Sequence, residues 1–312
     1  MTSQRKYIVA TRPSLLAYTQ TKQIVDLLKK ENPGCEFEII KYSTKGDRVA
    51  DRSLTEFGGT GIFVKELENA ILDKRADFAV HSLKDVPNDL PKDLILAAYP
   101  QRINPHDIFL TNDGTDLKGI KEGFVVGTGS PRRRIQIFNL RADASFMDIR
   151  GNIDTRIKKL DEGKYDAIIL AAAGLIRLGK VFPDNAELSF EECIPAIGQG
   201  AIALECRIDD NEAIEVLRKI NHPETEIAVT AERVFMRAIG GGCKFPMAAY
   251  GAIENDIITL YVIAGDLGSG KYVRMTDKSS VSEANIMAGK LANRLKAACL
   301  EGNIDLYSSF NV

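Results

Sequence analysis

Residues 78–87 read FAVHSLKDVP, and this stretch decides how the rest of the chain is interpreted. The apolar run 78–80 predicts a buried strand, and Pro87 prevents the strand from pairing further. Ligands of open α/β sheets bind beyond the strand ends, so Lys84 and Asp85 are expected at a ligand-binding edge. The ammonium could hold an anion and the carboxylate could stabilise a cation. The alternative is an exposed ion pair worth about 0–1 kcal/mol.

The same local pattern occurs a second time. Residues 63–72 predict a helix, which is followed by the turn Arg75-Ala76-Asp77 and the strand from Phe78. Residues 155–160 predict another helix, followed by Lys164-Tyr165-Asp166 and an apolar strand at 167–170. Two α/β domains of related design would produce this repeat. The alternative is that any two α/β units share such a pattern.

The flanking segments extend the α/β pattern and then change it. Ser14 can cap a helix that runs to Lys30 and is ended by Pro33-Gly34. Residues 43–61 are polar and Gly-rich, which favours a loop that could act as a lid. Beyond about residue 220, a helix is followed by three strands joined by tight turns and then by a last helix, which indicates an α+β module with an antiparallel sheet. Its expected elements are a helix at 224–239, strands at 248–253, 257–264 and 271–275, and a helix at 282–300.

Composition restricts the class of protein. The chain has 312 residues, a net charge of −2 and 45% hydrophobic residues, as expected for a globular protein of two or three domains. This charge balance, without Trp, does not favour nucleic-acid binding, and no apolar run is long enough to span a membrane. The five cysteines are scattered without a CxxC pair, which predicts free thiols in the cytoplasm and neither disulfides nor a metal site. The N-terminal residues also lack the pattern of a signal peptide.

Three further segments carry polar chemistry. Gly127-Thr128-Gly129-Ser130-Pro131 follows a strand and opens a basic helix, so its backbone N–H groups and arginines could hold an anion; the alternative is a solvated basic face. The Pro/Gly-rich segment 195–200 contains Gln199, either a cleft donor or part of a hinge turn. Cys243 follows three glycines, which favours an accessible thiol able to act as a nucleophile or attachment point; the alternative is a glycine helix end followed by a small apolar residue.

Taken together, these segments resemble the porphobilinogen deaminase (hydroxymethylbilane synthase) family. The resemblance runs from Ile8 to about Gly251, with a looser match in the last helix. It includes HSLKDVP at 81–87, RGNIDTR at 150–156, AGLIRLG at 173–179, PAIGQGAIALECR at 195–207 and the Gly-Gly-Cys loop. Several ordered matches of this kind are highly specific.

The resemblance implies a transferase that acts in tetrapyrrole biosynthesis. Such enzymes carry a dipyrromethane cofactor linked covalently to the loop cysteine, here Cys243. Four porphobilinogen units are added to it with loss of ammonia, and hydrolysis releases hydroxymethylbilane. Asp85 would be the catalytic carboxylate, because loss of ammonia leaves a cation that a fixed carboxylate stabilises. No metal is needed, and the family suggests a monomer.

The resemblance also assigns binding residues, fold and domains. Lys84, Ser130, Arg132, Arg133, Arg156 and Gln199 would bind the cofactor, and Arg12, Ser14, Arg150 and Arg177 the substrate, because each pyrrole carries two carboxylates. Two α/β domains resembling periplasmic binding proteins are expected, followed by an α+β domain. Their expected boundaries are 1–100 with 200–218 for domain 1, 101–199 for domain 2 and 219–312 for domain 3.

The chain departs from the family pattern at four positions. Gly129 replaces a serine and removes one hydroxyl, and Pro131 stiffens the helix start. Thr60 replaces a lysine in the suspected lid, and Gly240 stands where Glu is common. None of these removes Asp85 or Cys243, so activity is expected. The competing class is a two-domain solute-binding or sensor module, which would need the arginines but neither Asp85 nor Cys243.

Overall fold

The computed structural model describes residues 5–44, 64–240 and 245–306. The chain divides into two compact units, and the first combines Met1–Ile103 with Ala201–Glu226. The second combines Asn104–Gly200 with Ile227–Val312. The expected lid at 43–61 falls almost entirely outside the described residues.

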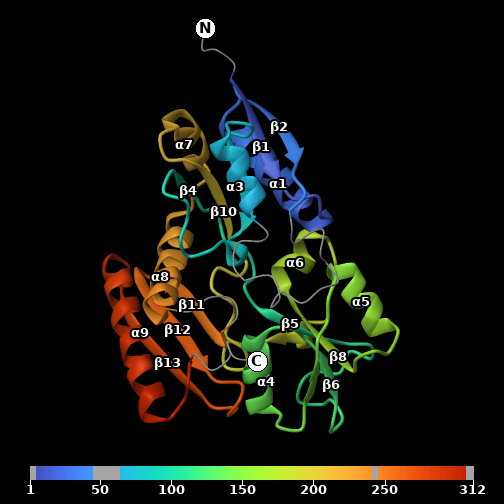
Figure 1. The fold of residues 1–312 in the computed structure, drawn as a ribbon. Coiled ribbons are helices and arrows are strands. Elements are labelled where there is room, and N and C mark those ends of the chain that lie inside the picture. The colour runs from blue at the N-terminus through green and yellow to red at the C-terminus, as the bar shows by residue number, and fades with distance from the viewer. Residues whose placement is uncertain (1–4, 45–63, 241–244, 307–312) are drawn as a thin grey trace. The chain divides into compact units, whose positions relative to one another are not determined.

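The first unit is built on a five-stranded sheet with one strand from far along the chain. The strand order is β2-β1-β3-β10-β4, and β10 lies antiparallel between β3 and β4. In Figure 1 the late β10 therefore lies among strands of the early part of the chain. The strands are β1 (Lys6–Thr11), β2 (Glu36–Lys41), β3 (Phe78–Ser82), β4 (Leu94–Ala98) and β10 (Ile202–Arg207).

Helices cover both faces of this sheet. On one face, Ile24 and Leu28 of α1 (Leu15–Glu31) and Leu217 of α7 (Asn211–Arg218) join a core with residues of β1, β3 and β10. On the other face, α3 (Lys65–Leu72) packs Leu67 and Ile71 against β1 and β3. Ser14 accepts a hydrogen bond from the Ala17 backbone N–H at 3.3 Å, so the predicted cap of α1 is confirmed.

The second unit contains a similar sheet, in the order β7-β6-β8-β5-β9. As in the first unit, three neighbouring strands are parallel and the next is antiparallel. The strands are β5 (Asp107–Thr111), β6 (Val125–Gly127), β7 (Ser145–Met147), β8 (Ala167–Ala171) and β9 (Glu187–Leu188). Its helices are α4 (Pro131–Leu140), α5 (Ile153–Asp161) and α6 (Ala172–Arg177).

The predicted repeat corresponds to matching hydrogen bonds in the two sheets. The Asp77 carboxylate accepts from the Ile8 N–H at 2.7 Å, and the Asp166 carboxylate accepts from the Val125 N–H at 2.8 Å. The backbone N–H of each aspartate donates back to the carbonyl of the same strand residue. The repeat is therefore a structural equivalence, in which β1, β2, β3 and β10 match β6, β7, β8 and β5.

The second unit also contains the predicted antiparallel sheet. Strands β11 (Met247–Glu254), β12 (Ile257–Gly265) and β13 (Tyr272–Ser280) pair as neighbours. Phe235 of α8 (Pro223–Ile239) and Leu291 and Leu295 of α9 (Ala284–Glu301) share one core with the sheet. Figure 1 shows α9 lying along this sheet. The α/β fold class with an α+β part is therefore confirmed, whereas the three-domain boundaries stay a prediction.

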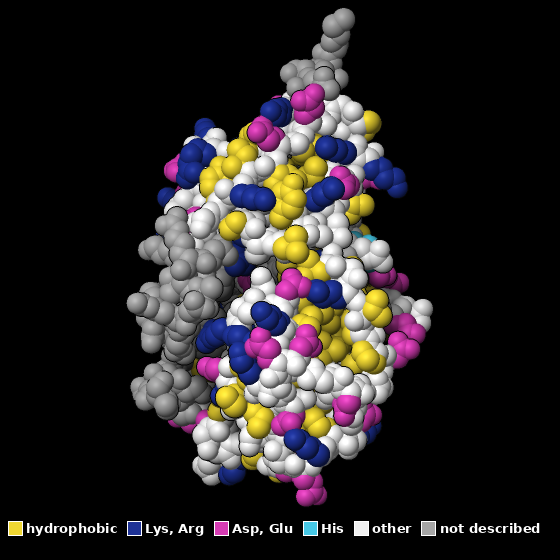
Figure 2. Space-filling model, turned by 90° about the vertical axis from the view of Figure 1, so that its right-hand side faces the viewer, with side chains coloured by type: hydrophobic (Ala, Val, Ile, Leu, Met, Phe, Trp, Pro, Cys, Tyr) yellow, Lys and Arg dark blue, Asp and Glu magenta, His cyan; other side chains and the backbone are white. Residues whose placement is uncertain are grey.

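Short 3-10 turns complete the elements: Leu83–Asp85 after β3, Asp184–Ala186 before β9 and Val281–Glu283 before α9. Figure 2 shows basic and acidic side chains mixed on the face in view, as expected for a net charge of −2. Among the described residues, no helix is long and apolar enough to cross a membrane.

Candidate active site

The first unit presents Lys84 and Asp85 directly after β3, as predicted. Both lie in the 3-10 turn Leu83–Asp85, and both are half-buried. The Ser82 hydroxyl donates to the Gln20 side chain of α1 at 3.1 Å, which ties the end of β3 to the neighbouring helix. The Leu83 N–H donates to the Ala201 carbonyl at 3.1 Å, so the turn is also fixed to the segment that leads into β10.

The Asp85 carboxylate has no ion-pair or hydrogen-bond partner among the described residues, Lys84 included. The simple explanation of these two residues as an ion pair is therefore wrong. A half-buried carboxylate that no protein donor satisfies can accept hydrogen bonds from a bound ligand. Arg12 and Ser14 follow the parallel strand β1 and are also half-buried, so they belong to the same edge of the sheet.

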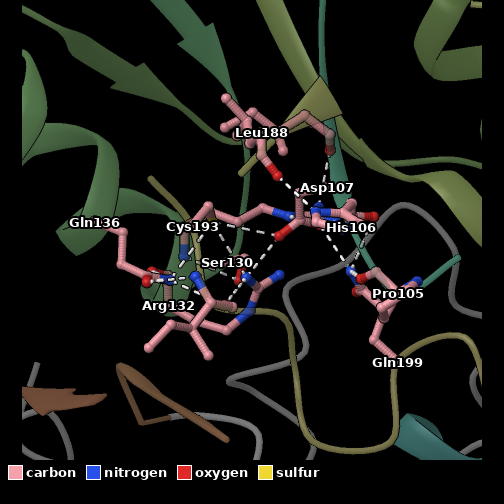
Figure 3. A network of polar contacts seen from close by, with 12 residues as sticks. Pro105, His106, Asp107, Ser130, Arg132, Gln136, Leu188, Cys193 and Gln199 are labelled. Atoms are coloured by element: carbon pink, nitrogen blue, oxygen red, sulfur yellow. Dashed lines mark hydrogen bonds and ion pairs between the residues drawn. The ribbon is translucent and has the colours of Figure 1, made fainter. Parts of the chain in front are cut away.

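In the second unit, several predicted residues meet at one buried carboxylate, Asp107 (Figure 3). Arg132 Nη1 donates to Asp107 Oδ2 and Arg133 Nη2 to Oδ1, both at 2.6 Å. Gln199 Nε2 donates to Oδ1 at 3.0 Å, and the Cys193 thiol donates to Oδ2 at 3.4 Å. Burial opposes ionisation, but attraction to Arg132 and Arg133 overcomes it and holds the pKa of Asp107 far below its usual range.

Sequence reasoning missed Asp107 as the residue that joins these side chains. Arg132 and Arg133 are buried, at 5% and 8% exposed, so the alternative of a solvated basic face is wrong. Arg133 also donates to the Ile169 carbonyl, and Arg132 to the Ile194 carbonyl, each at 2.8 Å. Asp107 stands at the start of an apolar strand, which was the one available signal. A cofactor-binding role for Arg132, Arg133 and Gln199 stays a prediction. The arginines would use the N–H groups that neither Asp107 nor a carbonyl occupies, whereas Gln199 Nε2 already donates to Asp107 and to the Pro105 carbonyl at 2.7 Å.

Arg156 and Arg177 differ from the Asp107 pair because no described carboxylate accompanies them. Arg156 Nε donates to the Gly151 carbonyl at 2.8 Å, and Arg177 Nη2 to the Gly200 carbonyl at 2.9 Å. Burial, together with repulsion from Arg133 and Arg150, lowers the pKa of Arg156 to about 10. Burial alone lowers the pKa of Arg177 to about 10. Both remain cations at neutral pH, so each is a partly desolvated positive charge whose counterion is not among the described residues.

Local sequence explains how these arginines are held. Gly151 has a φ of +109°, and a Cβ there would lie 2.6 Å from Thr155, so only glycine fits between Arg150 and α5. Asn152 then caps α5 by accepting from the Thr155 N–H at 2.9 Å. Arg150 lies 3.9 Å from Asp148, a distant ion pair. Ser130 caps α4 and accepts from the Arg133 N–H at 3.4 Å, while Pro131 occupies the first helical position as predicted.

The departures from the family pattern are partly visible. Gly240 ends α8 with a φ of +79°, and its N–H bonds the Met236 carbonyl at 3.2 Å, so glycine suits this position better than glutamate. A Cβ on Gly129 would meet Asp148 at an ordinary 3.7 Å, so the fold does not require glycine there. Cys243 and Thr60 lie outside the described residues. The other four cysteines, which are described, are free, and three of them are buried.

Comparison of the sequence with known proteins identifies a family. Residues 7–215 match a family model described as porphobilinogen deaminase, dipyrromethane cofactor binding domain. The chain belongs to the porphobilinogen deaminase family. Residues 226–297 match the C-terminal domain of porphobilinogen deaminase. A relative from Brevibacillus brevis named porphobilinogen deaminase is 48% identical over 83% of this chain and 84% of its own length. A relative of the same name from Neisseria meningitidis is 44% identical over 93% and 94%.

Two solved structures that match this chain resemble its fold only remotely. The periplasmic VFT2 domain of Bordetella pertussis BvgS aligns with a TM-score of 0.40 at 15% identity, over 69% of this chain and 86% of its own. The methionine-binding protein MetQ aligns with a TM-score of 0.43 at 9% identity, over 68% and 88%. These likenesses are too distant to support a binding function.

The second unit's arginines fit the cofactor that the family name implies. A dipyrromethane carries carboxylates, and Arg156 and Arg177 are half-buried cations without a described counterion. Mutual repulsion among Arg133, Arg150 and Arg156 also favours an added anion. Within the described residues, no group of three or more His, Cys, Asp or Glu side chains could hold a metal ion.

Proposed function

We propose that this porphobilinogen deaminase family member condenses four porphobilinogen units head to tail, with loss of ammonia, and releases hydroxymethylbilane by hydrolysis. In each condensation a C–N bond breaks and ammonia leaves, a C–C bond forms, and a ring proton is transferred to a base. The bound dipyrromethane supplies the pyrrole end to which units are added. We assign its covalent attachment to Cys243.

The observation that carries this proposal is the unpartnered Asp85 carboxylate at the end of β3. It can accept hydrogen bonds from pyrrole N–H groups, and its negative charge stabilises the cationic stages of substitution at the ring. It can also receive the ring proton, because it is a base that no described protein group neutralises. Lys84, next to it in the turn, contributes an ammonium for a substrate carboxylate.

The arginines bind the growing chain through its carboxylates. Arg156 and Arg177 gain counterions when those carboxylates arrive, which offsets the cost of keeping guanidinium groups partly buried. Arg150 and Arg12 extend the set of cations, and Ser14 and Ser130 place their hydroxyls at helix starts, where backbone N–H groups favour anions. Asp107 holds Arg132 and Arg133 in fixed orientations, so the remaining N–H groups of these two arginines are preorganised, and Gln199 helps to hold Asp107 in place.

The reaction uses porphobilinogen, water and this chain with its bound dipyrromethane. We propose the cytoplasm as its location, which the four free thiols among the described cysteines support. A monomer without a nucleic-acid partner remains the expectation.

The deciding experiment is the intact mass of the purified protein beside Cys243→Ala and Cys35→Ala. We expect the parent and Cys35→Ala proteins to carry the mass of two linked pyrrole units, and Cys243→Ala to lack it. Cys35 is a suitable control because it is a half-buried free cysteine. A parent mass equal to the bare chain, even after incubation with porphobilinogen, would reject the proposal and favour a non-catalytic binding module.

A further inference from the structure

Three titratable side chains gather on one face of the first sheet, and one of them lies on β3, which leads into the Lys84–Asp85 turn. His81 of β3 and Glu205 of β10 form a pair with His81 Nε2 and Glu205 Oε2 2.9 Å apart. Glu68 lies on α3, which covers the same face of the sheet, and Glu205 and His81 act on its charge. All three are buried, at 8%, 4% and 0% exposed for Glu68, His81 and Glu205. We refer to them as the buried acid–histidine cluster.

The cluster is costly for the fold. Glu205 Oε1 is buried and has no hydrogen-bond partner among the described residues, where His81 is the side chain that bonds this carboxylate. Burying a charged pair is often less favourable than packing apolar side chains of similar size. Burial, followed by repulsion from Glu205, raises the pKa of Glu68 to about 7, against the attraction of His81 and of Lys65 on its own helix. Glu68 therefore gains its negative charge near neutral pH.

The internal repeat shows what the fold accepts at these positions. Asp77 matches Asp166, so His81 matches Leu170 of β8 and Glu68 matches Ile157 of α5. The ends of the two helices agree with this alignment. The backbone N–H of Arg75 donates to the Ala70 carbonyl, and that of Lys164 donates to the equivalent Lys159 carbonyl.

Strand register supplies the third equivalence. Glu205 pairs with Ala79 in the first unit, and Leu110 of β5 pairs with Ile168 in the second, so Glu205 matches Leu110. Leu110, Ile157 and Leu170 lie in one hydrophobic core. The same fold is thus built with three apolar side chains in the second unit and three titratable ones in the first.

The Lys84–Asp85 turn provides the reason for the difference. Its counterparts after β8 are Ala173 and Gly174, which carry no charge. The buried cluster occurs in the unit that carries the candidate catalytic carboxylate, and an apolar core occupies its place in the other. His81 also lies on the strand that leads into the turn, four residues before Asp85.

We propose that Glu68, His81 and Glu205 are positioning residues whose charge sets the proton affinity of Asp85. This inference rests on the proposed function, because it assumes that Asp85 is the catalytic carboxylate. When Glu68 ionises, the cluster gains a negative charge, and Asp85 becomes a stronger base and a better stabiliser of a cation. Lys84 beside Asp85 and Lys65 on α3 oppose that effect and limit its size.

The test compares the pH dependence of kcat in the parent protein with that of Glu68→Gln. A unit charge at about 10 Å in a protein environment shifts a neighbouring pKa by about one unit. The parent kcat should therefore gain about three- to tenfold between pH 6 and 8 relative to Glu68→Gln, with KM within about twofold. Glu187→Gln is the matched control, because Glu187 pairs with His106 in the second unit at 3.5 Å, and its profile should follow the parent.

A second variant separates position from fold. The triple change Glu68→Ile, His81→Leu and Glu205→Leu installs the side chains of the second unit. It should unfold at a urea concentration no lower than the parent and retain the cofactor mass, but lose at least tenfold in kcat. Parent-like kcat and pH profiles in both Glu68→Gln and the triple variant would overturn the inference. If the triple variant does not fold, Glu68→Gln and Glu205→Gln decide alone. Full activity of Asp85→Asn would instead remove Asp85 from the mechanism, and a parent protein that releases no hydroxymethylbilane would reject the proposed function.

Discussion

Asp77 and Asp166 accept equivalent hydrogen bonds in the two α/β sheets. Each aspartate stands just before a strand, β3 or β8, and accepts from a backbone N–H of the neighbouring parallel strand, β1 or β6. The O···N distances are 2.7 Å for Asp77 with Ile8 and 2.8 Å for Asp166 with Val125. Asp77 additionally meets Arg5 at 3.1 Å and Arg207 at 3.6 Å, whereas Asp166 meets the exposed Lys121. The two units therefore share a connection but differ in the charges around it.

We expect Asp166→Ala to lower the free energy of unfolding by about 1–3 kcal/mol, because a backbone N–H loses a charged acceptor. Asp77→Ala should cost more, since it also leaves Arg5 and Arg207 with one carboxylate fewer. Urea denaturation of both variants checks this order. Equal losses would mean that the pairing of Asp77 with Arg5 and Arg207 adds no stability, and no loss in either variant would mean that the shared hydrogen bond does not stabilise its sheet.

Asp85→Asn should reduce kcat by about 10²- to 10⁴-fold, because the amide is neither a base nor a negative charge. Its unfolding midpoint should stay at the parent value, since no described residue bonds the Asp85 carboxylate. Asp89→Asn is the control, because Asp89 is an exposed acid four residues farther along. Steady-state release of hydroxymethylbilane and urea denaturation provide the two readouts. A catalytically normal Asp85→Asn protein would remove this residue from the mechanism.

Asp107→Asn should destabilise the second unit by about 3–5 kcal/mol, because two buried guanidinium groups lose their shared counterion. The folded pKa of Asp107 is depressed, so its contribution is complete above the unfolded value of about 3.9 and declines as pH falls toward the folded value. The stability gap between parent and variant should therefore be constant from pH 5 to 8 and narrow below about pH 4.

Urea titrations at several pH values measure that gap. Asp143→Asn is the comparison, since Asp143 pairs with Arg141 at 2.8 Å outside the buried network and should matter much less. A gap that widens as the solution is acidified would contradict the ion pairing described here.

Arg156→Leu should stall chain growth without weakening the fold. It removes a partly buried cation that has no described carboxylate, so the free energy of unfolding should be unchanged or higher. Arg141→Leu should lower the free energy of unfolding and leave chain growth unchanged, because Arg141 donates to the Leu117 carbonyl at 2.8 Å and pairs with Asp143. Native gels after limited porphobilinogen addition should show accumulated short intermediates for Arg156→Leu only. Uniform loss of the cofactor mass would indicate a role in cofactor assembly instead.

Local signals were sufficient for much of the fold and for part of the site. Ser14 and Pro131 act at helix starts as their residue types predict, and the turn at 83–85 follows from an apolar strand that runs toward Pro87. The Asp107 network could not be predicted in this way, because its members are far apart in sequence: Arg132 is 25 residues and Gln199 is 92 residues from Asp107. Only the folded sheet brings them together.

The same limit applies to the buried acid–histidine cluster. His81 lies in the stretch 78–87, but no role could be assigned to it without its partner Glu205, which lies 124 residues away. The residue types alone, one histidine and one glutamate in apolar runs, do not reveal pairing. The register of β10 against β3 does.

The central place of β10 determines the order in which the chain can fold as it leaves the ribosome. Strands β1 to β4 have been synthesised by Ala98. Strands β3 and β4 do not pair with each other, so they cannot be joined in one sheet until Ile202–Arg207 has been made and lies between them. About a hundred residues separate these segments, which corresponds to about 5–20 s of synthesis. The second α/β sheet ends at Leu188 and is whole before the first. The first sheet therefore keeps β3 with an open edge until Ile202–Arg207 has been made, by which time every strand of the second α/β sheet has been synthesised.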